Sequence, residues 1–580
     1  MAKKVVIIGG GVGGKSAAHE LMERGFEVEV YERKKYYPGG KARSVDVPDS
    51  NKIQEDKYLP GEHGFRFFPG FYKHLPDTMK RIPYYDSSGK KMNVTDNLVS
   101  TNRMKIARYG KKAIETISNF PDSFEDLKFA IHSLHSDTGL TDEEKHHFAL
   151  KIWQLMTSCY DRRANDYERL GWWEFTDADD FPPPSQYQPL LVEGVTRTLV
   201  AANAQYASTK TDGDIILQML FNITNPFLHA DRVLNGPTND RWLYPWLDHL
   251  RKNGVKYTFH QLAEKIDFDT KSNMISGVWL KNLDTNESYK VTGDYYILAT
   301  PVEVAATLIN DEMIAWDQTL NGIEELATST AWMTGIQYYL TEDVEIVHGH
   351  CMYVDTQWAL TSISQLQFWT DYDIHIRGDG KVKGILSVDV SNWENPGLNG
   401  KKAMECTREE IKIEVWAQLK KSLNVEGQEV LRDDMILDWY LDKDIYEVHP
   451  HLDANKEPFL VNRVDTWCLR PEAYTNIANL FLASDYVRTF TDLATMEAAN
   501  EAARRAVNCI IDHSGVDAEP CGIWNLQEPI WLKQLRAFDH RRYNNGLPYK
   551  FHEPWWMKVF VWFFRTFLKH RMTHVEKAKT

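Results

Sequence analysis

Cysteine is scarce in this chain. Six cysteines occur among 580 residues, and no two of them have the Cys-x-x-Cys spacing, so neither a disulfide framework nor a paired-cysteine metal site is indicated. The sequence also lacks a His-Glu-x-x-His motif and an arrangement of Ser, His and Asp typical of hydrolases. We therefore expect a reducing compartment, no metal, and neither metal-dependent nor nucleophilic hydrolysis.

Positive charge and long apolar runs are also in short supply. Lys and Arg number 67 against 82 Asp and Glu, which gives a net charge of -15 and argues against a general nucleic-acid-binding protein. No uninterrupted apolar run reaches the roughly 18 to 20 residues that span a bilayer. The chain enters an apolar strand at Val5, which leaves no room for the three regions of a signal peptide. We expect a cytoplasmic protein of two or three domains.

The first 32 residues have the pattern of a strand, a glycine turn, a helix and a second strand. Residues 5–8 are continuously apolar, and residues 26–32 alternate and end in an acid, Glu32. The turn has the spacing of a dinucleotide-binding loop, in which glycines permit a tight turn, close approach of a pyrophosphate and close helix packing; its glycines are Gly9, Gly11, Gly13 and Gly14. Glu32 would accept hydrogen bonds from ribose hydroxyls. The alternative is a tight loop with nothing bound.

A second glycine pair follows this acid. Gly39 and Gly40 precede Lys41 and Arg43, a pattern that can wrap the far side of a pyrophosphate and ribityl chain. The alternative is a surface turn with solvated cations. An acid at the ribose position disfavours the 2'-phosphate of NADP, which leaves NAD or FAD as the nucleotide.

Residues 1–44 resemble the flavin-binding signature of the amine oxidase and phytoene desaturase superfamily. Lys41 stands where that family usually has arginine, and Arg43 follows two residues later, so either cation could contact phosphate. Residues 61–72 resemble the stretch of glycine, histidine and aromatic residues that carotenoid desaturases place beside the flavin. Within it, His63 and Arg66 are the candidate catalytic groups. The alternatives are a structural histidine and an anion clamp without a catalytic role.

Three later segments resemble family motifs and occur in the family's order. Residues 235–268 resemble a helix and strand on the adenine side, with Ala263 as a backbone contact, and residues 297–301 resemble the strand beneath the nucleotide. Residues 480–499 resemble the C-terminal FAD motif. The resemblance therefore implies FAD as the cofactor.

In the C-terminal motif, Asp485 would bind the ribityl or pyrophosphate region, and the helix start near Met496 would present N–H groups to the flavin. Cys468 lacks the surroundings of a covalent flavin tether and is expected to be a buried structural thiol. The complete predicted cofactor-binding set is Gly9, Gly11, Gly13, Gly14, Glu32, Arg33, Gly39, Gly40, Lys41, Arg43, Glu62, Ala263, Asp485 and Met496.

Strands alternate with helices at both ends of the chain, which predicts an α/β fold. We expect a Rossmann-like FAD-binding domain assembled from the discontinuous residues 1–125, 231–311 and 451–512. Residues 126–230 and 312–450 would form an α+β substrate or cap domain, and residues 513–580 a helical C-terminal tail.

The end of the chain is basic and aromatic. Residues 531–580 contain eleven Lys and Arg against three Asp and Glu. In a helix over residues 555–569, Lys558, Arg565 and Lys569 would share one side and leave a broad aromatic face, the pattern of a helix lying in a membrane interface. The alternative is a helix that packs on the body of the protein or on a partner chain.

Together, the resemblance and the tail imply an FAD-dependent oxidoreductase of the desaturase type, peripheral to a membrane. Its substrate would be an apolar lipid or an isoprenoid or carotenoid-like compound, oxidised by hydride transfer to flavin N5. The alternatives are a flavin-dependent amine oxidase, a flavin-mediated isomerase or saturase of a polyene lipid, and a membrane-associated scaffold with structural FAD. An oligomer is compatible with the sequence.

Overall fold

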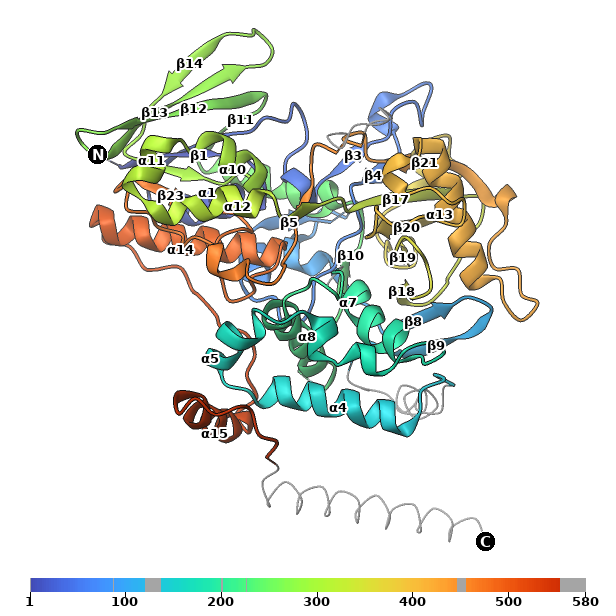
Figure 1. Cartoon of the computed structure of the whole chain (residues 1–580). Coiled ribbons are helices and arrows are strands. Elements are labelled where there is room, and N and C mark those ends of the chain that lie inside the picture. The colour runs from blue at the N-terminus through green and yellow to red at the C-terminus, as the bar shows by residue number, and fades with distance from the viewer. Residues whose placement is uncertain are drawn as a thin grey trace.

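The computed structural model describes residues 2–86, 88–119, 137–199, 202–225, 227–445 and 455–552. Figure 1 shows three units: a parallel sheet with its helices, a mixed sheet with a long helix, and a group of helices. The parallel unit combines segments from both ends of the chain, so that α1 and α14 lie together. The predicted fold class, an α/β protein with a dinucleotide-binding unit built from discontinuous segments, is confirmed.

The parallel sheet has five strands in the order β11-β2-β1-β15-β23. Strands β1, β15 and β23 are apolar in sequence and almost entirely buried, as expected for a sheet covered on both faces, whereas β2 and β11 also carry charged, exposed residues. Their bounds are Lys4–Ile8 for β1, Glu27–Tyr31 for β2, Lys256–Thr258 for β11, Tyr295–Leu298 for β15 and Leu480–Leu482 for β23. Helices α1 (Val12–Glu23) and α14 (Met496–Ser514) pack against each other and against this sheet.

An antiparallel sheet of three strands, β12 (Gln261–Asp269), β13 (Met274–Asn282) and β14 (Ser288–Val291), shares the apolar core of the parallel sheet. Helices α10 (Val302–Leu308), α11 (Asp311–Trp316) and α12 (Asn321–Ala327) follow β15. Smaller elements pack on one or other of the two larger sheets: β3 (Ser44–Asp46), β4 (Pro60–Glu62), α2 (His74–Lys80), β5 (Pro83–Tyr85), β6 (Lys91–Asn93), β7 (Leu98–Ser100), β10 (Arg232–Leu234), α9 (Tyr244–Lys252), β16 (Thr330–Ala331) and β22 (Phe459–Leu460).

The mixed sheet has seven strands in the order β21-β17-β20-β19-β18-β8-β9. Helix α13 (Arg408–Leu423) packs on it through Ile411, Val415 and Leu419. The strands are β8 (Arg103–Arg108), β9 (Lys111–Ile117), β17 (Thr334–Leu340), β18 (Gly349–Tyr353), β19 (Leu360–Ser364), β20 (Gly384–Val390) and β21 (Ile436–Leu441).

The boundary predicted at residue 125 differs from this topology. Strands β8 and β9 were expected in the FAD-binding domain, but β8 pairs in parallel with β18 and β9 pairs with β8. These backbone hydrogen bonds place residues 103–117 in the mixed sheet. The cap region therefore begins before residue 125.

The helical unit is formed by α4 (Asp142–Thr157), α5 (Tyr160–Arg162), α6 (Trp172–Phe175), α7 (Glu193–Leu199) and α8 (Thr209–Ile223). The cap residue Thr141 and Glu144 form a capping box that begins α4. Helix α15 (Leu532–Asn544) packs on this unit, and Leu532 and Leu535 are buried in its core.

Part of the predicted tail therefore belongs to the body of the protein. Leu532 and Leu535 of α15 are buried in one apolar core with Leu155 of α4 and Leu217 of α8. The basic aromatic residues 555–569 lie outside the described residues. Among the described helices, none is both long enough and apolar enough to cross a bilayer.

Candidate active site

A cavity of about 470 Å³ lies where the three units meet. On one side it is lined by residues that follow parallel strands, such as Gly9, Glu32 and Ser484. On the other side it is lined by the mixed sheet and α8, through residues such as Asp389 and Ile215. In open α/β sheets, ligands bind outside the carboxyl ends of the strands, and this cavity occupies that position.

The glycine loop packs closely against the segments that follow β15 and β23. Gly9 has φ +104°, and a Cβ there would lie 2.6 Å from the carbonyl oxygen of Ala299. A Cβ on Gly13 would lie 2.3 Å from the carbonyl oxygen of Ala483. The residue before α1, Gly11, has no side chain to cap the helix, so the first N–H groups of α1 remain available to an anion.

Gly9, Gly11 and Gly13 line the cavity, whereas Gly14 does not. A Cβ on Gly14 would lie 1.9 Å from the carbonyl oxygen of Gly9. The helix and the turn are therefore in close contact at this point. Gly14 contributes to the site through packing.

Glu32 is held at the end of β2 by backbone donors. Its Oε2 accepts from the Gly10 N–H at 2.8 Å, and its Oε1 accepts from the Lys34 N–H at 2.7 Å. The carboxylate is buried at the cavity wall, where Arg33 also lies. This fixed acid retains lone pairs for ribose hydroxyls.

The second glycine pair packs directly against the first loop. Gly39 forms a parallel bridge with Gly11, and Gly39 and Gly40 both have positive φ and line the cavity. Lys41 also lines the cavity, and its Nζ lies 3.2 Å from Glu303.

Arg43 does not line the cavity. Its guanidinium is buried and donates to three carboxylates, with distances of 2.9 Å to Asp442, 2.5 Å to Asp444 and 2.5 Å to Glu457. The predicted contact of Arg43 with the cofactor is therefore not supported, because its donors are engaged elsewhere. Lys41 is the cation of this pair that faces the cavity.

His63 and Arg66 both line the cavity. The Nδ1 of His63 lies 3.0 Å from Asp442, and its ring stacks on Phe459. Although burial alone would raise it, the His63 hydrogen bond and the Arg43 charge hold the pKa of Asp442 well below its usual range. This pair fixes the orientation of the imidazole.

Two carboxyl groups adjoin Arg66, whose Nη2 donates to the carbonyl oxygen of Lys41 at 2.9 Å. Burial raises the pKa of Glu62 to about 7, although the Arg66 charge opposes the shift. Glu62 does not line the cavity; it accepts from the Thr238 N–H at 2.9 Å, so its predicted cofactor contact is not supported. Burial also raises the pKa of Asp389 to about 7, again against Arg66, and Asp389 does line the cavity.

Ala263, Asp485 and Met496 all line the cavity, and their contacts with a cofactor stay a prediction. Asp485 follows β23, and its backbone oxygen accepts from Arg470 at 2.7 Å. Met496 begins α14, where the cap Thr495 accepts from Ala498. Cys468 is exposed and lies outside the cavity lining, so it is not the buried thiol that was expected.

Sequence reasoning missed the wall contributed by the cap. Its apolar members include Ile215, Met219 and Trp332. It also includes Asp212 on α8, which is fully buried and whose two carboxylate oxygens have no hydrogen-bond partner among the described residues. Burial raises the pKa of Asp212 well above its usual range, and Glu168 adds to the shift. The sequence signal that could have pointed to this residue was an acid, Asp212, in a helix whose other buried positions are largely apolar.

The residues present fit FAD. Gly9, Gly11 and Gly13 line the cavity without side chains, the start of α1 and Lys41 offer positive charge for a pyrophosphate, and Glu32 and Asp485 offer acceptors for hydroxyls. If FAD binds there, these groups hold its phosphates and sugar.

The sequence comparisons agree with this site. Residues 7–82 match the NAD(P)-binding Rossmann-like domain, and residues 247–511 match the flavin containing amine oxidoreductases. The zeta-carotene desaturase of Synechocystis sp. is 22% identical over 546 residues, which cover 88% of this chain and 97% of that protein. The 15-cis-phytoene desaturase of Synechococcus elongatus is 22% identical over 329 residues, 55% of this chain and 63% of that protein.

The chain belongs to the superfamily of flavin-containing amine oxidoreductases and phytoene desaturase-like proteins. Among solved structures, cyclohexylamine oxidase from Brevibacterium oxydans IH-35A has the same fold, with a TM-score of 0.58 and 12% identity over 89% of this chain and 100% of that chain. This member of the superfamily is an FAD-dependent oxidoreductase.

Proposed function

We propose that this flavoenzyme is a desaturase-type dehydrogenase of an apolar isoprenoid or carotenoid-like lipid. The observation that carries the proposal is the apolar wall supplied by the cap and its neighbours: Ile215, Met219, Trp332, Phe459 and Leu460. Such a wall binds a hydrocarbon chain by removing its surface from water, at about 25 cal/mol per Å². These five side chains offer no charged group to a polar substrate.

The residues of this chain would orient the substrate and manage a proton. When bound, FAD supplies an acceptor for a hydride. Loss of that hydride from one carbon, and of a proton from its neighbour, gives a carbon-carbon double bond. The Asp389 carboxyl is suited to accept the proton, because burial raises its pKa to about 7. His63 is held by Asp442 through Nδ1, and its Nε2 has no hydrogen-bond partner among the residues that the structure describes.

The similarity to known desaturases supports the same reaction type and substrate class. The zeta-carotene desaturase match extends over nearly the whole of both chains, so both the nucleotide unit and the cap are included in the similarity. The basic aromatic residues 555–569 also suit an enzyme that takes its substrate from lipid, and we propose peripheral membrane association through them.

Amine oxidation is the second candidate. Two carboxyl groups of the cavity wall, Asp212 and Asp389, could pair with an amine, and the fold is shared with cyclohexylamine oxidase. A flavin-mediated isomerase or saturase of a polyene would use the same cofactor residues, so these reactions are distinguished by product rather than by site.

Extraction of the purified protein followed by mass spectrometry tests the substrate class. We expect an isoprenoid or polyene lipid to co-purify with the wild type, and to decrease in a Met219→Lys variant, which places a charge in the apolar wall. A folded Lys80→Met variant, changed at an exposed position of α2, serves as the control. Absence of any apolar compound, together with a bound amine, would favour the second candidate.

A further inference from the structure

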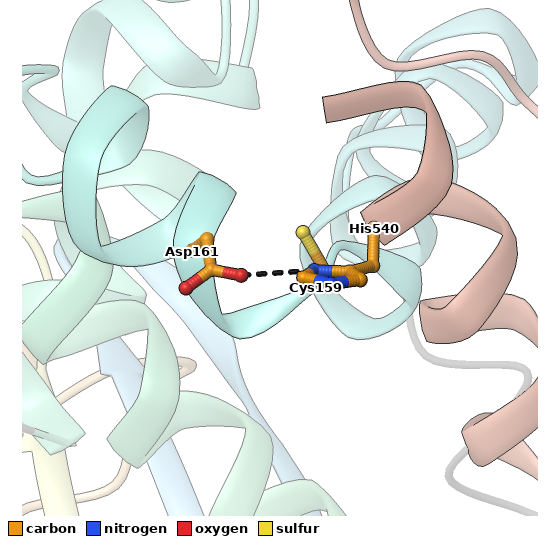
Figure 2. A group of neighbouring side chains, drawn as sticks. All are labelled: Cys159, Asp161 and His540. Carbon is orange, nitrogen blue, oxygen red and sulfur yellow. Dashed lines mark ion pairs between the residues drawn. The ribbon is translucent and has the colours of Figure 1, made fainter. Parts of the chain in front are cut away.

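Three potential metal ligands converge outside the cavity. Figure 2 shows Cys159 and Asp161 at the turn into α5, facing His540 of α15. The thiol sulfur, a carboxylate oxygen and a ring nitrogen all lie within 4.8 Å of one another. Nδ1 of His540 is already 2.9 Å from Oδ2 of Asp161. None of the three residues lines the cavity, so the proposed function does not use them.

We propose that Cys159, Asp161 and His540 form a binding site for Zn²⁺. Sulfur, imidazole nitrogen and carboxylate oxygen are the ligand types that zinc takes in proteins, and three protein ligands leave a fourth position for water. A thiolate and a carboxylate together would neutralise the charge of the ion. Binding requires the Cys159 thiol to release its proton to solvent.

Neighbouring residues hold the ligands in place. The Cys159 N–H donates to Oδ2 of Asp539 at 2.9 Å, and Arg162 Nε donates to the same carboxylate. Asn544 lies one turn beyond His540, with its side-chain amide nitrogen 3.1 Å from Nε2. A turn of this amide would let it accept from Nε2–H when Nδ1 binds the metal.

The burial of the ligands suits a metal that enters from solvent. The Cys159 side chain is buried, whereas the side chains of Asp161 and His540 are 42% and 49% exposed. An ion can therefore reach the carboxylate and imidazole first and then meet the thiol. Because His540 lies on α15 and the other ligands lie beside α4 and α5, bound zinc would join α15 to the helical unit.

Titration of the full-length protein with Co²⁺ tests the site, because cobalt bound to a thiolate gives a charge-transfer absorption in the near ultraviolet. Difference spectra against metal-free protein subtract the flavin. We expect one cobalt per chain, displaced by Zn²⁺. The band should disappear in Cys159→Ser and weaken strongly in His540→Gln, and Asn544→Ala should lower the metal affinity by roughly 10- to 100-fold.

The matched controls are Cys468→Ser and His146→Gln, which change an exposed cysteine and an exposed histidine away from the cluster. Both should retain the wild-type band. Because His540 is half exposed, its variant should fold even if Cys159→Ser does not. No band in the wild type, or a band that persists in Cys159→Ser and His540→Gln, would overturn the proposal. Loss of the band in Cys468→Ser would overturn it as well.

Discussion

Lys41 and Arg43 are two residues apart and have opposite surroundings. Arg43 is buried among carboxylates that lie 399 to 414 residues later in the chain, so its charge is compensated within the protein. Lys41 is at the cavity wall. Because a buried cation such as Arg43 needs all its partners, Arg43 belongs to the framework that orients His63 through Asp442.

Asp485→Ala should weaken FAD binding more than it weakens the fold. Asp485 lines the cavity at the end of β23, and hydrogen bonds to a charged group contribute about 1.5 to 3 kcal/mol, so we expect roughly 10- to 100-fold lower affinity. Flavin content and circular dichroism check this. The exposed Asp512→Ala is the control, and a folded Asp485→Ala protein with full FAD content would contradict the assignment.

Asp389→Asn should change how stability depends on pH. The folded pKa of about 7 lies above the ordinary aspartate value of 3.8, so the folded state binds more protons between these values and stability falls as pH rises through them. The slope is at most about 1.4 kcal/mol per pH unit for one group. Thermal midpoints from pH 4 to 7 should fall less steeply in the variant than in the wild type. Some pH dependence should remain in the variant, because the pKa of Glu62 is also raised to about 7. Equal slopes would show that the Asp389 carboxyl is not shifted.

Among the elements, α15 has the most direct test. Leu535 is 3% exposed in the core of the helical unit, whereas Leu547 is 45% exposed. A buried Leu→Ala change costs about 2 to 5 kcal/mol, so Leu535→Ala should lower the thermal midpoint clearly and Leu547→Ala should leave it nearly unchanged. Equal midpoints for the two variants would mean that α15 does not pack on the body.

Several elements could be predicted from sequence because their signals are local. The strand, glycine turn, helix and second strand predicted for the first 32 residues are present as β1, α1 and β2. Strand β8 was predicted to lie with the FAD-binding domain, but it pairs with β18, about 250 residues later in the chain. The sequence of residues 103–108 contains no signal that identifies this distant strand as its partner.

The same distinction separates the parts of the site. The glycine loop and Glu32 are recognisable because turn geometry and strand ends are encoded within short segments, and Asp485 was indicated by the resemblance of residues 480–499 to the family's FAD motif. Asp212 and Asp389 acquire their surroundings only when α8 and the mixed sheet meet the parallel sheet. Their shifted pKa values arise from burial, which the local sequence does not specify.

At the scale of the whole molecule, the proposed membrane association rests on residues 555–569, which lie beyond the described part of the chain. A protein truncated after residue 552 retains every cavity-lining residue and should keep its FAD. It should lose binding to anionic vesicles, because Lys558, Arg565 and Lys569 each contribute on the order of 1 kcal/mol at such a surface.

Co-sedimentation of both proteins with vesicles over a range of salt concentrations checks this prediction. Binding of the full-length protein should weaken with salt but persist, since burial of aromatic side chains is not screened. Equal sedimentation of the two proteins would assign membrane binding to another surface.

The most direct test of the central claim is anaerobic mixing of the FAD-loaded protein with vesicles that contain an acyclic polyene. The flavin absorption is recorded and the lipid is analysed by mass spectrometry. A desaturase-type dehydrogenase should bleach its flavin only when the polyene is present and give a product that has lost two hydrogen atoms. Bleaching by cyclohexylamine but not by the polyene, or an altered polyene of unchanged mass, would contradict the account.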